Sequence, residues 1–210
     1  MFVTVEGVEG AGKSTLLHLL GRELESRGIS FIRTREPGGC GLGANLRPIL
    51  LDVSSRLDSR AELFLFLADR AQHVAETIRP ALERGDWVLC DRYADSTIAY
   101  QGYGRGMDVE HLQMLNDYAT GGLWPDRTLL LDLPVETGLA RALARNGREG
   151  LSASEGRFEA EERAFHQRIR DGFLARAARW PERFRVLDAA SEPEILLKQA
   201  LCALGLEVRG

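Results

Sequence analysis

A short segment near the amino terminus has the residue types and spacing of a phosphate-binding loop. It matches the pattern G-x-x-x-x-G-K-[ST] at every fixed position, with Gly7, Val8, Glu9, Gly10, Ala11, Gly12, Lys13 and Ser14. In such a loop backbone N–H groups turn toward phosphate oxygens, the lysine reaches the β- and γ-phosphates, and the hydroxyl binds Mg²⁺. A glycine-rich turn that binds nothing is the alternative, but an apolar run precedes this loop and a leucine-rich helical pattern follows it. The sequence therefore predicts a site for ATP and Mg²⁺ over residues 7–15, ending at Thr15.

A second carboxylate is predicted to lie near this loop. The apolar run Trp87–Cys90 indicates a buried strand, and Asp91 follows at its end. In sites that transfer phosphoryl groups, an acidic side chain at such a strand end helps to hold Mg²⁺. Asp91 alone would be weak evidence, so Ser14 and Asp91 are predicted together as the metal ligands.

Composition limits the class of protein. The chain has 210 residues, 44% of them hydrophobic, and residues 1–210 are expected to fold as a single domain. A net charge of −4 and a pI near 5.7 argue against binding to a nucleic acid polymer or an anionic membrane. The cysteines are odd in number and widely spaced, which fits reduced thiols and not a protein-ligated zinc site. No signal peptide or membrane-length apolar run appears, so a cytoplasmic protein is expected.

Short apolar runs predict strands that alternate with helices. The predicted strands are Phe2–Val5, Ile29–Thr34, Trp87–Cys90, Thr128–Leu131 and Phe184–Leu187. Helical patterns lie between them, at 14–27, at 59–85, from 108 to 121, from 134, from 158 and after 191. This alternation indicates an α/β fold of the P-loop NTPase type, with a parallel five-stranded sheet and helices on both faces. Residues 35–43 are interpreted as a loop, and residues 91–106 as a polar and aromatic run.

Two helix starts carry the signature of a capping box, in which a hydroxyl and a carboxylate three residues later bond to the backbone. They are Ser59 with Glu62, and Ser191 with Glu194. Residues 145–157 are polar and rich in glycine and serine, with too little hydrophobic periodicity to pack. They are predicted to form a mobile lid.

The phosphate-binding loop alone is shared by kinases, GTPases, motor ATPases and molecular switches. The sequence contains no NKxD-like motif for guanine recognition. The predicted lid carries Arg145, Arg148 and Arg157, which could close over the phosphates of a nucleotide. These features favour a kinase that acts on a small molecule.

Five motifs, in this order, resemble those of the thymidylate (dTMP) kinases, particularly the bacterial form, over nearly the whole chain. They are EGVEGAGKS at 6–14, TREPGG at 34–39, the pair Phe66 and Arg70, DRYADST at 91–97, and AYQGYGRG at 99–106. The resemblance implies a nucleoside monophosphate kinase-like fold and a homodimer. It also implies an enzyme of dTTP biosynthesis that transfers the γ-phosphoryl group of ATP, with Mg²⁺, to dTMP.

The resemblance also implies roles for individual side chains. Phe66 would stack on thymine and Arg70 would bond to its O4, and their i, i+4 spacing puts both on one helix face. Taken alone, the pair would be better explained as a core phenylalanine and a solvated arginine. Arg47 and Arg92 would hold the monophosphate, with Arg35 as a further candidate. The remaining implied contacts are Glu9 near the sugar 3′-hydroxyl and the metal, Tyr100 beneath the sugar, and Pro37, Thr97 and Gln101 along the substrate.

Catalysis in this interpretation needs no general base. The second pKa of a phosphate monoester is about 6, so the attacking oxygen is largely ionised at pH 7. Lys13, Arg92, Glu9 and a lid arginine would position and neutralise the reacting groups. The bacterial family usually ends its lid with a compact Asp-Arg-[Ile/Phe]-Glu, whereas this chain has a longer insertion before Glu155-Gly156-Arg157-Phe158-Glu159. We therefore favour Arg157 as the catalytic lid arginine, with Arg148 and Arg145 as alternatives.

Two other functions remain open at this point. Another P-loop nucleotide or nucleoside kinase would need a base pocket suited to a different ring. A P-loop switch would bind ATP and change partners without transferring phosphate to a metabolite. Release of ADP that depends on dTMP distinguishes both from a dTMP kinase.

Overall fold

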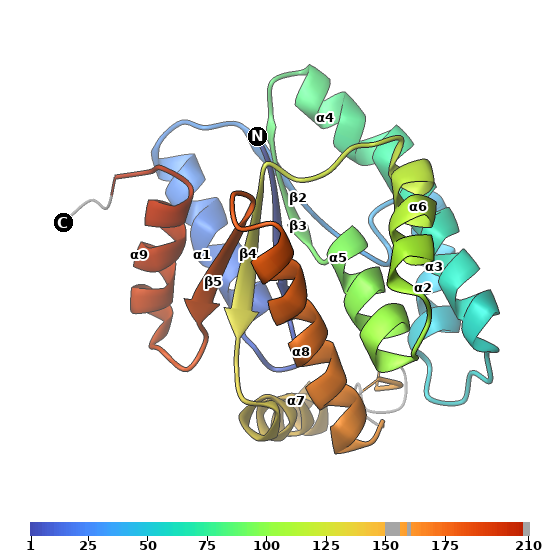
Figure 1. Cartoon of the computed structure of the whole chain (residues 1–210). Helices are drawn as coiled ribbons and strands as arrows, with labels where there is room; N and C mark the ends of the chain where they lie inside the picture. Colours follow the sequence, from blue (N-terminus) through green and yellow to red (C-terminus); the bar gives the residue numbers. More distant parts are fainter. Residues whose placement is uncertain (150–155, 159–160, 208–210) are drawn as a thin grey trace.

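The computed structural model describes residues 1–149, 156–158 and 161–207. Over these residues a parallel five-stranded sheet forms the centre of the protein, in the order β2-β3-β1-β4-β5 (Figure 1). The strands are β1 (Phe2–Gly7), β2 (Phe31–Arg35), β3 (Trp87–Asp91), β4 (Arg127–Asp132) and β5 (Phe184–Asp188). The predicted fold class is confirmed, and each predicted strand is present with small shifts at its ends.

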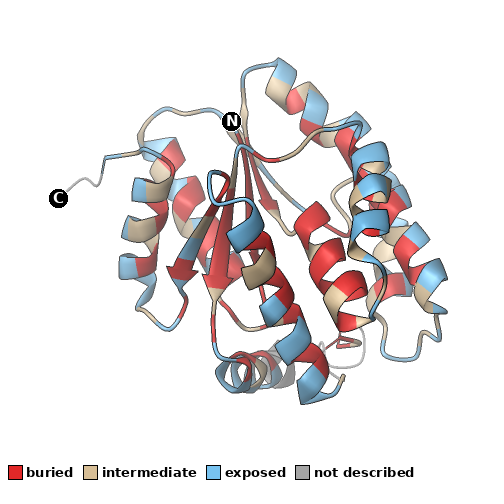
Figure 2. Ribbon diagram, viewed as in Figure 1, coloured by how far each residue is buried: buried red, intermediate tan, exposed pale blue. Residues whose placement is uncertain are grey.

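Helices cover both faces of the sheet. On one face, α1 (Lys13–Ser26) packs against α9 (Pro193–Ala203), while α5 (Ala94–Thr97) and α8 (Arg163–Arg179) contact the other face. Figure 2 shows the central strands largely buried: every residue of β1 is buried, and β3 and β4 are half-buried only at their end residues. The almost unbroken apolar runs of the strands follow from this burial on two sides.

A second group of helices extends from the β2-β3 side of the sheet, on the right of Figure 1. It contains α2 (Gly41–Leu51), α3 (Ser59–His73), α4 (Arg79–Glu83) and α6 (Val109–Thr120). The π-helical segment η1 (Val74–Ile78) joins α3 to α4, so the single long helix predicted at 59–85 is continuous but widened in its middle. A second π-helical segment, η2 (Ile98–Gly104), continues α5.

Two helical segments lie where the sequence did not indicate them. The helix α2 starts inside the predicted loop 35–43, and α5 with η2 occupies the polar and aromatic run. In α2 the glycines lower the intrinsic helix propensity. A Cβ atom on Gly43 would lie 2.0 Å from Oδ1 of Asp69 on α3, so glycine permits the close approach of the two helices. Packing of α2 against α3 therefore stabilises the helical conformation of this segment.

The capping box predicted at Ser59 is wrong. Asp58 is the N-cap of α3, and its side chain accepts a hydrogen bond from the backbone N–H of Arg60. The Glu62 side chain is fully buried and bonds to other side chains instead of to the helix start. The spacing of Ser59 and Glu62 suggested a helix cap, but the Glu62 carboxylate bonds to side chains that are distant in the sequence.

The capping box predicted at Ser191 is also wrong. The hydroxyl of Ser191 donates to Oδ2 of Asp188 at 3.3 Å, and Glu192 occupies the N-cap of α9 without a side-chain hydrogen bond. Pro193 begins the helix, which suits proline because the first helical N–H has no partner within the helix.

The helix α7 (Val135–Glu149) lies below the carboxyl ends of the strands in Figure 1. It contacts the phosphate-binding loop directly, since a Cβ atom on Gly10 (φ 71°) would lie only 2.0 Å from the carbonyl oxygen of Gly138. Residues 145–149, predicted as the start of the lid, are helical. Most of the remaining lid, 150–155, lies outside the described residues, and its mobility stays a prediction. Helix α8 starts at Arg163, later than expected.

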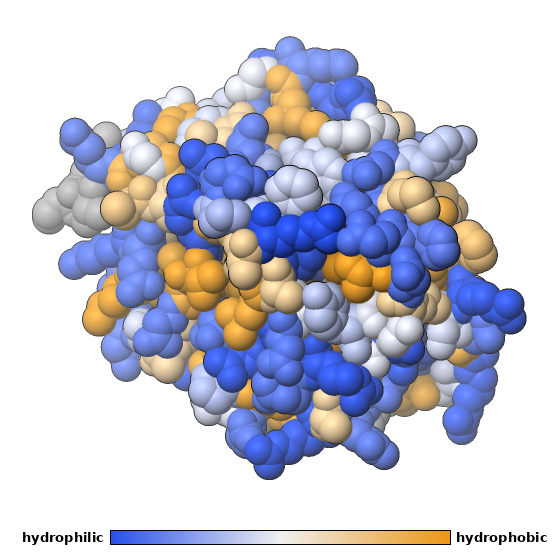
Figure 3. All heavy atoms as spheres, viewed as in Figure 1, coloured by the Kyte–Doolittle hydropathy of each residue, from blue (hydrophilic) through white to orange (hydrophobic). Residues whose placement is uncertain are grey.

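Among residues 1–149, 156–158 and 161–207, no helix combines the length and the apolar character needed to cross a bilayer. The face drawn in Figure 3 is mainly hydrophilic, with apolar residues in small separate groups.

Candidate functional site

A cavity of about 760 Å³ lies at the carboxyl edge of the sheet. Its volume is typical of ligand pockets, which measure roughly 300–1,000 Å³. The carboxyl ends of parallel strands are where α/β proteins bind ligands. The predicted site residues that line the cavity are Glu9, Gly10, Ala11, Gly12, Lys13, Ser14, Thr15, Arg35, Pro37, Arg47, Phe66, Arg70, Asp91, Arg92, Thr97, Tyr100 and Gln101.

Lys13, the first residue of α1, is buried at the base of the loop. Its Nζ donates hydrogen bonds to the carbonyl oxygens of Gly7, at 3.1 Å, and Val8, at 2.9 Å. Gly7 and Val8 thus support the lysine and do not line the cavity. Burial, together with the charge of Arg92, lowers the pKa of Lys13 to about 8, although nearby carboxylates oppose the shift. The ammonium group is held where it can meet an anion.

Glu9 is fixed within the loop by two side chains. Nη2 of Arg92 donates to Oε1 of Glu9 at 2.9 Å, and the hydroxyl of Tyr100 donates to the same oxygen. Burial alone would raise the pKa of Glu9, but the charge of Arg92 and the contact with His166 outweigh it and hold the pKa well below its usual range. Oε2 of Glu9 has no hydrogen-bond partner among the described residues, and Nδ1 of His166 lies 3.5 Å from it.

Arg92 lies between the loop and the ring of Tyr100. Its φ of 66° falls in the left-handed region that non-glycine residues rarely adopt, a feature that clusters at functional sites. Nη1 donates to the carbonyl oxygen of Gly7 at 3.0 Å and to Oγ of Ser96 at 3.3 Å. The guanidinium carbon is 4.9 Å from the centre of the Tyr100 ring. These contacts hold a permanent cation in one orientation beside the cavity.

The two predicted metal ligands lie together. Oγ of Ser14 donates to Oδ2 of Asp91 across 3.5 Å, which is a long hydrogen bond. Oδ1 of Asp91 is buried without a hydrogen-bond partner among the described residues. A hydroxyl and an unpaired carboxylate oxygen are suitable donors for Mg²⁺, which usually takes one or two protein ligands and completes its shell with phosphate oxygens and water. No described group of three or more acidic, His or Cys side chains could hold a metal without such help.

Arg70 is buried in the wall of the cavity, with 1% of its surface exposed. Its Nε donates to Oε2 of Glu36 at 2.8 Å, and its Nη1 donates to Oγ1 of Thr97 at 2.7 Å and to Oδ1 of Asn116 at 2.5 Å. On the other side of Glu36, Nδ1 of His73 lies 2.9 Å from Oε1. We call Glu36, Arg70, His73, Thr97 and Asn116 the base wall. The interpretation of Arg70 as a solvated surface residue is therefore wrong.

The arginines predicted to hold a monophosphate line the cavity beside the base wall. Nη1 of Arg47 donates to the carbonyl oxygen of Pro37 at 2.8 Å. This bond ties α2 to the loop that follows β2. Arg35, at the end of β2, is exposed and also lines the cavity. Together with Arg92 they provide three cations from three different elements around one space.

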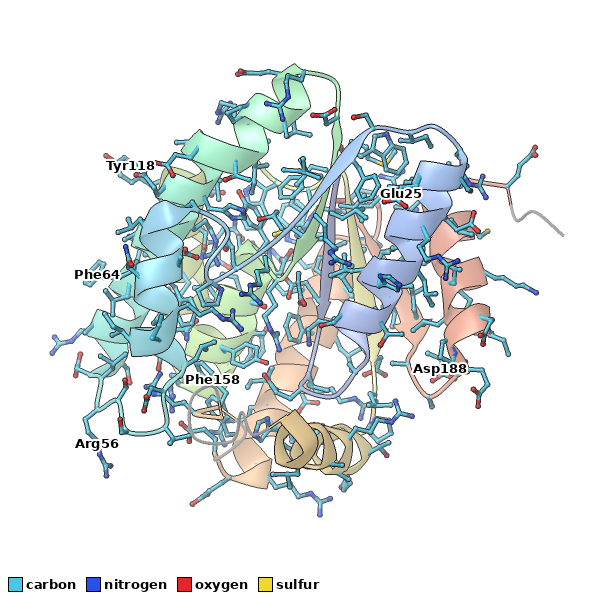
Figure 4. The ribbon with its side chains drawn as sticks, turned by 180° about the vertical axis from the view of Figure 1, so that it is seen from behind. Glu25, Arg56, Phe64, Tyr118, Phe158 and Asp188 are labelled. Atoms are coloured by element: carbon cyan, nitrogen blue, oxygen red, sulfur yellow. The ribbon has the colours of Figure 1, made fainter. Side chains whose placement is uncertain are left out.

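Residues 156–158, which we call the return segment of the predicted lid, lie at one side of the cavity. Phe158, labelled in Figure 4 near the amino-terminal end of α3, lines the cavity and lies 6.4 Å from Phe66 between ring centres. The preceding Arg157 does not line it. Its Nη2 is 2.7 Å from Oε2 of Glu62, and its Nη1 donates to the carbonyl oxygen of Leu50 at 3.1 Å. The side chain of Arg148 lies outside the described residues.

Several residues in or next to the cavity were not predicted from the sequence. Asn116 on α6 and His166 on α8 reach the site from distant parts of the chain. Arg141 on α7 and the segment 189–193 after β5 line the end of the cavity beyond the phosphate-binding loop. Figure 4 labels Asp188, the last residue of β5, at this end. The position of this segment at the carboxyl end of a parallel strand was the one signal that could have identified it.

The chain is similar in sequence and in structure to proteins of one family. The family profile described as "Thymidylate kinase" matches residues 5–200. The thymidylate kinase of Desulfovibrio desulfuricans is 58% identical over 210 residues, which cover 100% of this chain and 97% of that protein. That of Nitratidesulfovibrio vulgaris (strain DSM 19637 / Miyazaki F) is 58% identical over 205 residues, or 97% of this chain and 95% of that protein. The crystal structure of thymidylate kinase from Ehrlichia chaffeensis is 34% identical, with a TM-score of 0.77, and the match covers 97% of this chain and 98% of that one.

Proposed function

This chain belongs to the thymidylate kinase family and transfers the γ-phosphoryl group of ATP to dTMP, and we propose that its cavity holds the two nucleotides end to end. ATP lies with its phosphates on residues 7–15, and dTMP lies along the base wall. The observation that carries this arrangement is the continuity of one cavity from Lys13 and Ser14 to Phe66 and Arg70. In-line transfer needs the acceptor phosphate close to the γ-phosphate, which a single continuous cavity allows.

In this arrangement the base wall recognises thymine. The hydrogen bonds of Arg70 to described residues use Nε and Nη1, so Nη2 is left to donate to O4 of the base. Phe66 stacks on the ring, while Thr97 and Gln101 lie along its edge. Pro37 lies beside the nucleotide and orients Arg47 through its carbonyl oxygen.

The sugar and the monophosphate lie toward the loop. Tyr100 packs beneath the deoxyribose, and Oε2 of Glu9, which has no partner among the described residues, accepts a hydrogen bond from the 3′-hydroxyl. Arg92 and Arg47 hold the phosphate, with Arg35 at the exposed side. The acceptor oxygen is already ionised near pH 7, so the protein's task is orientation and charge neutralisation by Lys13 and these arginines.

Ser14 and Asp91 would hold Mg²⁺. A metal ion bound there would supply positive charge near the phosphates of ATP. The unpaired Oδ1 of Asp91 supports this assignment, since a buried carboxylate oxygen without a partner is costly unless a ligand satisfies it.

We keep Arg157 as the favoured catalytic lid arginine, with Arg148 as the alternative. In the described arrangement Arg157 pairs with Glu62, so it would have to release that carboxylate before it could reach the phosphates. Arg157→Ala should then lower kcat by about 10³-fold or more, the low end for a catalytic arginine. If Arg157→Ala stays near the parent value while Arg148→Ala loses kcat, the role belongs to Arg148.

A homodimer through α3 and α6 also belongs to this proposal. These helices pack together and expose Phe64 (60%), Met114 (59%) and Tyr118 (90%). Figure 4 labels Phe64 and Tyr118 on the same outer side. Sedimentation should give twice the monomer mass at working concentration, and a monomer would contradict the proposal. The expected cytoplasmic location stays a prediction that cell fractionation would test.

A coupled assay of ADP release tests the proposed arrangement of the site. With Mg²⁺ and ATP, dTMP should be phosphorylated well and dUMP more weakly. Thymidine should be inert, because the arginines of the site are placed for an existing phosphate. Turnover of thymidine at the same rate as dTMP would overturn the assignment of Arg47 and Arg92.

A further inference from the structure

Glu62 is a buried carboxylate that joins three separate segments. Its side chain on α3 is 0% exposed. Nε2 of Gln101 on η2 donates to Oε1 at 2.7 Å, Nη2 of Arg105 lies 3.3 Å from Oε2, and Nη2 of Arg157 lies 2.7 Å from Oε2. Arg105 also pairs with Glu161, just before α8, at 2.6 Å. A residue expected to cap a helix is thus at the centre of a buried polar cluster.

The partners of Glu62 settle which way the amide of Gln101 must point. The guanidinium groups of Arg105 and Arg157 carry only donors, so the oxygens of the Glu62 carboxylate act as acceptors. Nε2 of Gln101 donates to the same carboxylate, so the NH₂ group of the amide faces Glu62. Assignment of amide nitrogen and oxygen is often ambiguous, but here the partner removes the ambiguity.

The amide carbonyl of Gln101 is left for the cavity. Gln101 is 1% exposed and lines the cavity near Thr97 and Phe66. Its Oε1 makes no hydrogen bond to the described residues, whereas Nε2 is used by Glu62. Thymine presents N3–H as a donor on its pairing edge, and cytosine presents an unprotonated N3 as an acceptor. A carbonyl oxygen that faces the base accepts a hydrogen bond from N3–H of thymine. The same oxygen would face the acceptor N3 of cytosine, which is unfavourable because neither atom carries a hydrogen.

We propose that Glu62 is a specificity-determining positioning residue: it holds the Gln101 amide with its carbonyl toward the pyrimidine, so that the site admits thymine and rejects cytosine. This inference rests on the proposed position of the base beside Phe66 and Arg70. Glu62 does not touch the nucleotide and acts through Gln101. The cluster also links the base site to the return segment of the lid through Arg157.

The test compares kcat/KM for dTMP and dCMP in matched variants. Glu62→Gln keeps the size of the side chain, but the new amide can donate a hydrogen bond as well as accept one. The side-chain amide of Gln101 can then flip and exchange its oxygen and nitrogen. The ratio of kcat/KM for dTMP to kcat/KM for dCMP should fall about 10- to 100-fold, the range for one buried group left unpaired. Arg157→Gln removes another partner of Glu62 but leaves its bond to Gln101, so the ratio should stay unchanged whatever happens to turnover.

A double-mutant cycle separates positioning from general damage. In a Gln101→Ala background, Glu62→Gln should not change the ratio further, because the group through which it acts is gone. Should Glu62→Gln fail to fold because it leaves Arg157 without a partner, the paired variant Glu62→Gln/Arg157→Gln replaces it. An unchanged ratio in a folded variant, or an equal change in the Gln101→Ala background, would overturn the inference. A parent protein with no preference for dTMP over dCMP would instead overturn the proposed base site.

Discussion

The two ends of the cavity satisfy their buried polar groups in different ways. In the base wall, the guanidinium of Arg70 bonds to Glu36, Thr97 and Asn116, and His73 bonds to the far side of Glu36. At the phosphate end, Oε2 of Glu9, Oδ1 of Asp91 and both ring nitrogens of His166 are buried without hydrogen-bond partners among the described residues.

This difference indicates that the polar groups of the base wall stabilise the fold, whereas the unpaired groups at the phosphate end gain partners only when a ligand binds. A buried network with several hydrogen bonds fixes its members before substrate arrives, and removal of one member leaves others unpaired. A group left unpaired lowers stability until a ligand completes it, which is a common compromise at active sites. Substitutions in the base wall should therefore affect folding and activity together, while those at the phosphate end should affect activity alone.

The largest effect is expected at the phosphate end. Lys13→Ala removes the buried ammonium group that is proposed to contact the transferring phosphate. The value of kcat/KM should fall on the order of 10³-fold, as for loss of one preorganised charge-stabilising group. The matched control is Lys198→Ala, which changes the only other lysine, exposed on α9, and should leave turnover unchanged. A loss of less than tenfold in Lys13→Ala would remove this lysine from the mechanism.

In the base wall, Arg70→Ala should destabilise the protein as well as weaken dTMP binding. It leaves Glu36, whose side chain is 2% exposed, with His73 alone. The free energy of unfolding should drop by about 3 kcal/mol, the low end for breaking a buried ion pair, because His73 remains and the cavity admits water. Urea denaturation measures the loss. Arg60→Ala, on an exposed pair at the start of the same helix, should leave stability unchanged; equal losses in the two variants would contradict the comparison.

The pH dependence of ATP use should report the lowered pKa of Lys13. In the proposed site the ammonium form of Lys13 binds phosphate, and this form is present below a pKa of about 8 and lost above it. In the free enzyme kcat/KM for ATP should thus be level between about pH 7 and 8, where the acceptor phosphate is ionised, and fall about tenfold per unit above pH 8. Lys13→Arg should remove this alkaline fall, at lower absolute activity, since arginine stays charged. A level profile to pH 10 in the parent protein would contradict the prediction.

The smallest effect on stability is expected for Asp91→Asn. Because Oδ1 of Asp91 has no described partner, the change removes little that holds the fold, and the free energy of unfolding should stay within about 1 kcal/mol of the parent. The Mg²⁺ concentration for half-maximal activity should rise. Urea denaturation and a Mg²⁺ titration measure the two effects. A stability loss as large as that of Arg70→Ala would remove the contrast between the two ends.

The sequence predicted those parts of the site that are encoded locally. The phosphate-binding loop is a contiguous motif, and the strand before it and the helix after it follow from apolar pattern alone. Phe66 and Arg70 share a helix face because of their spacing. These features need no knowledge of distant contacts, so they could be read from one chain.

The parts that were missed depend on contacts between distant residues. Asn116 joins Arg70 from 46 positions away, and no local signal distinguishes it from other asparagines. Glu62 matched a capping pattern, yet its partners come from η2 and the lid. The helix α2 contains glycines and Pro48, so propensity argued against it, and only its packing on α3 explains it.

The π-helical segment η2 has a consequence for insertions and deletions. In it the N–H of Arg105 bonds to the carbonyl of Tyr100, five residues earlier, at 2.9 Å, so one residue more is accommodated than an α-helical turn would hold. Loss of any single residue between 98 and 104 would restore α-helical pairing and rotate the following side chains by about 100° relative to the preceding ones. Arg105, which follows every position of the segment, would then be turned away from Glu62. Among related genes, the length of this segment should therefore vary less than its composition, and a gap in it should mark a change in the base that the enzyme accepts.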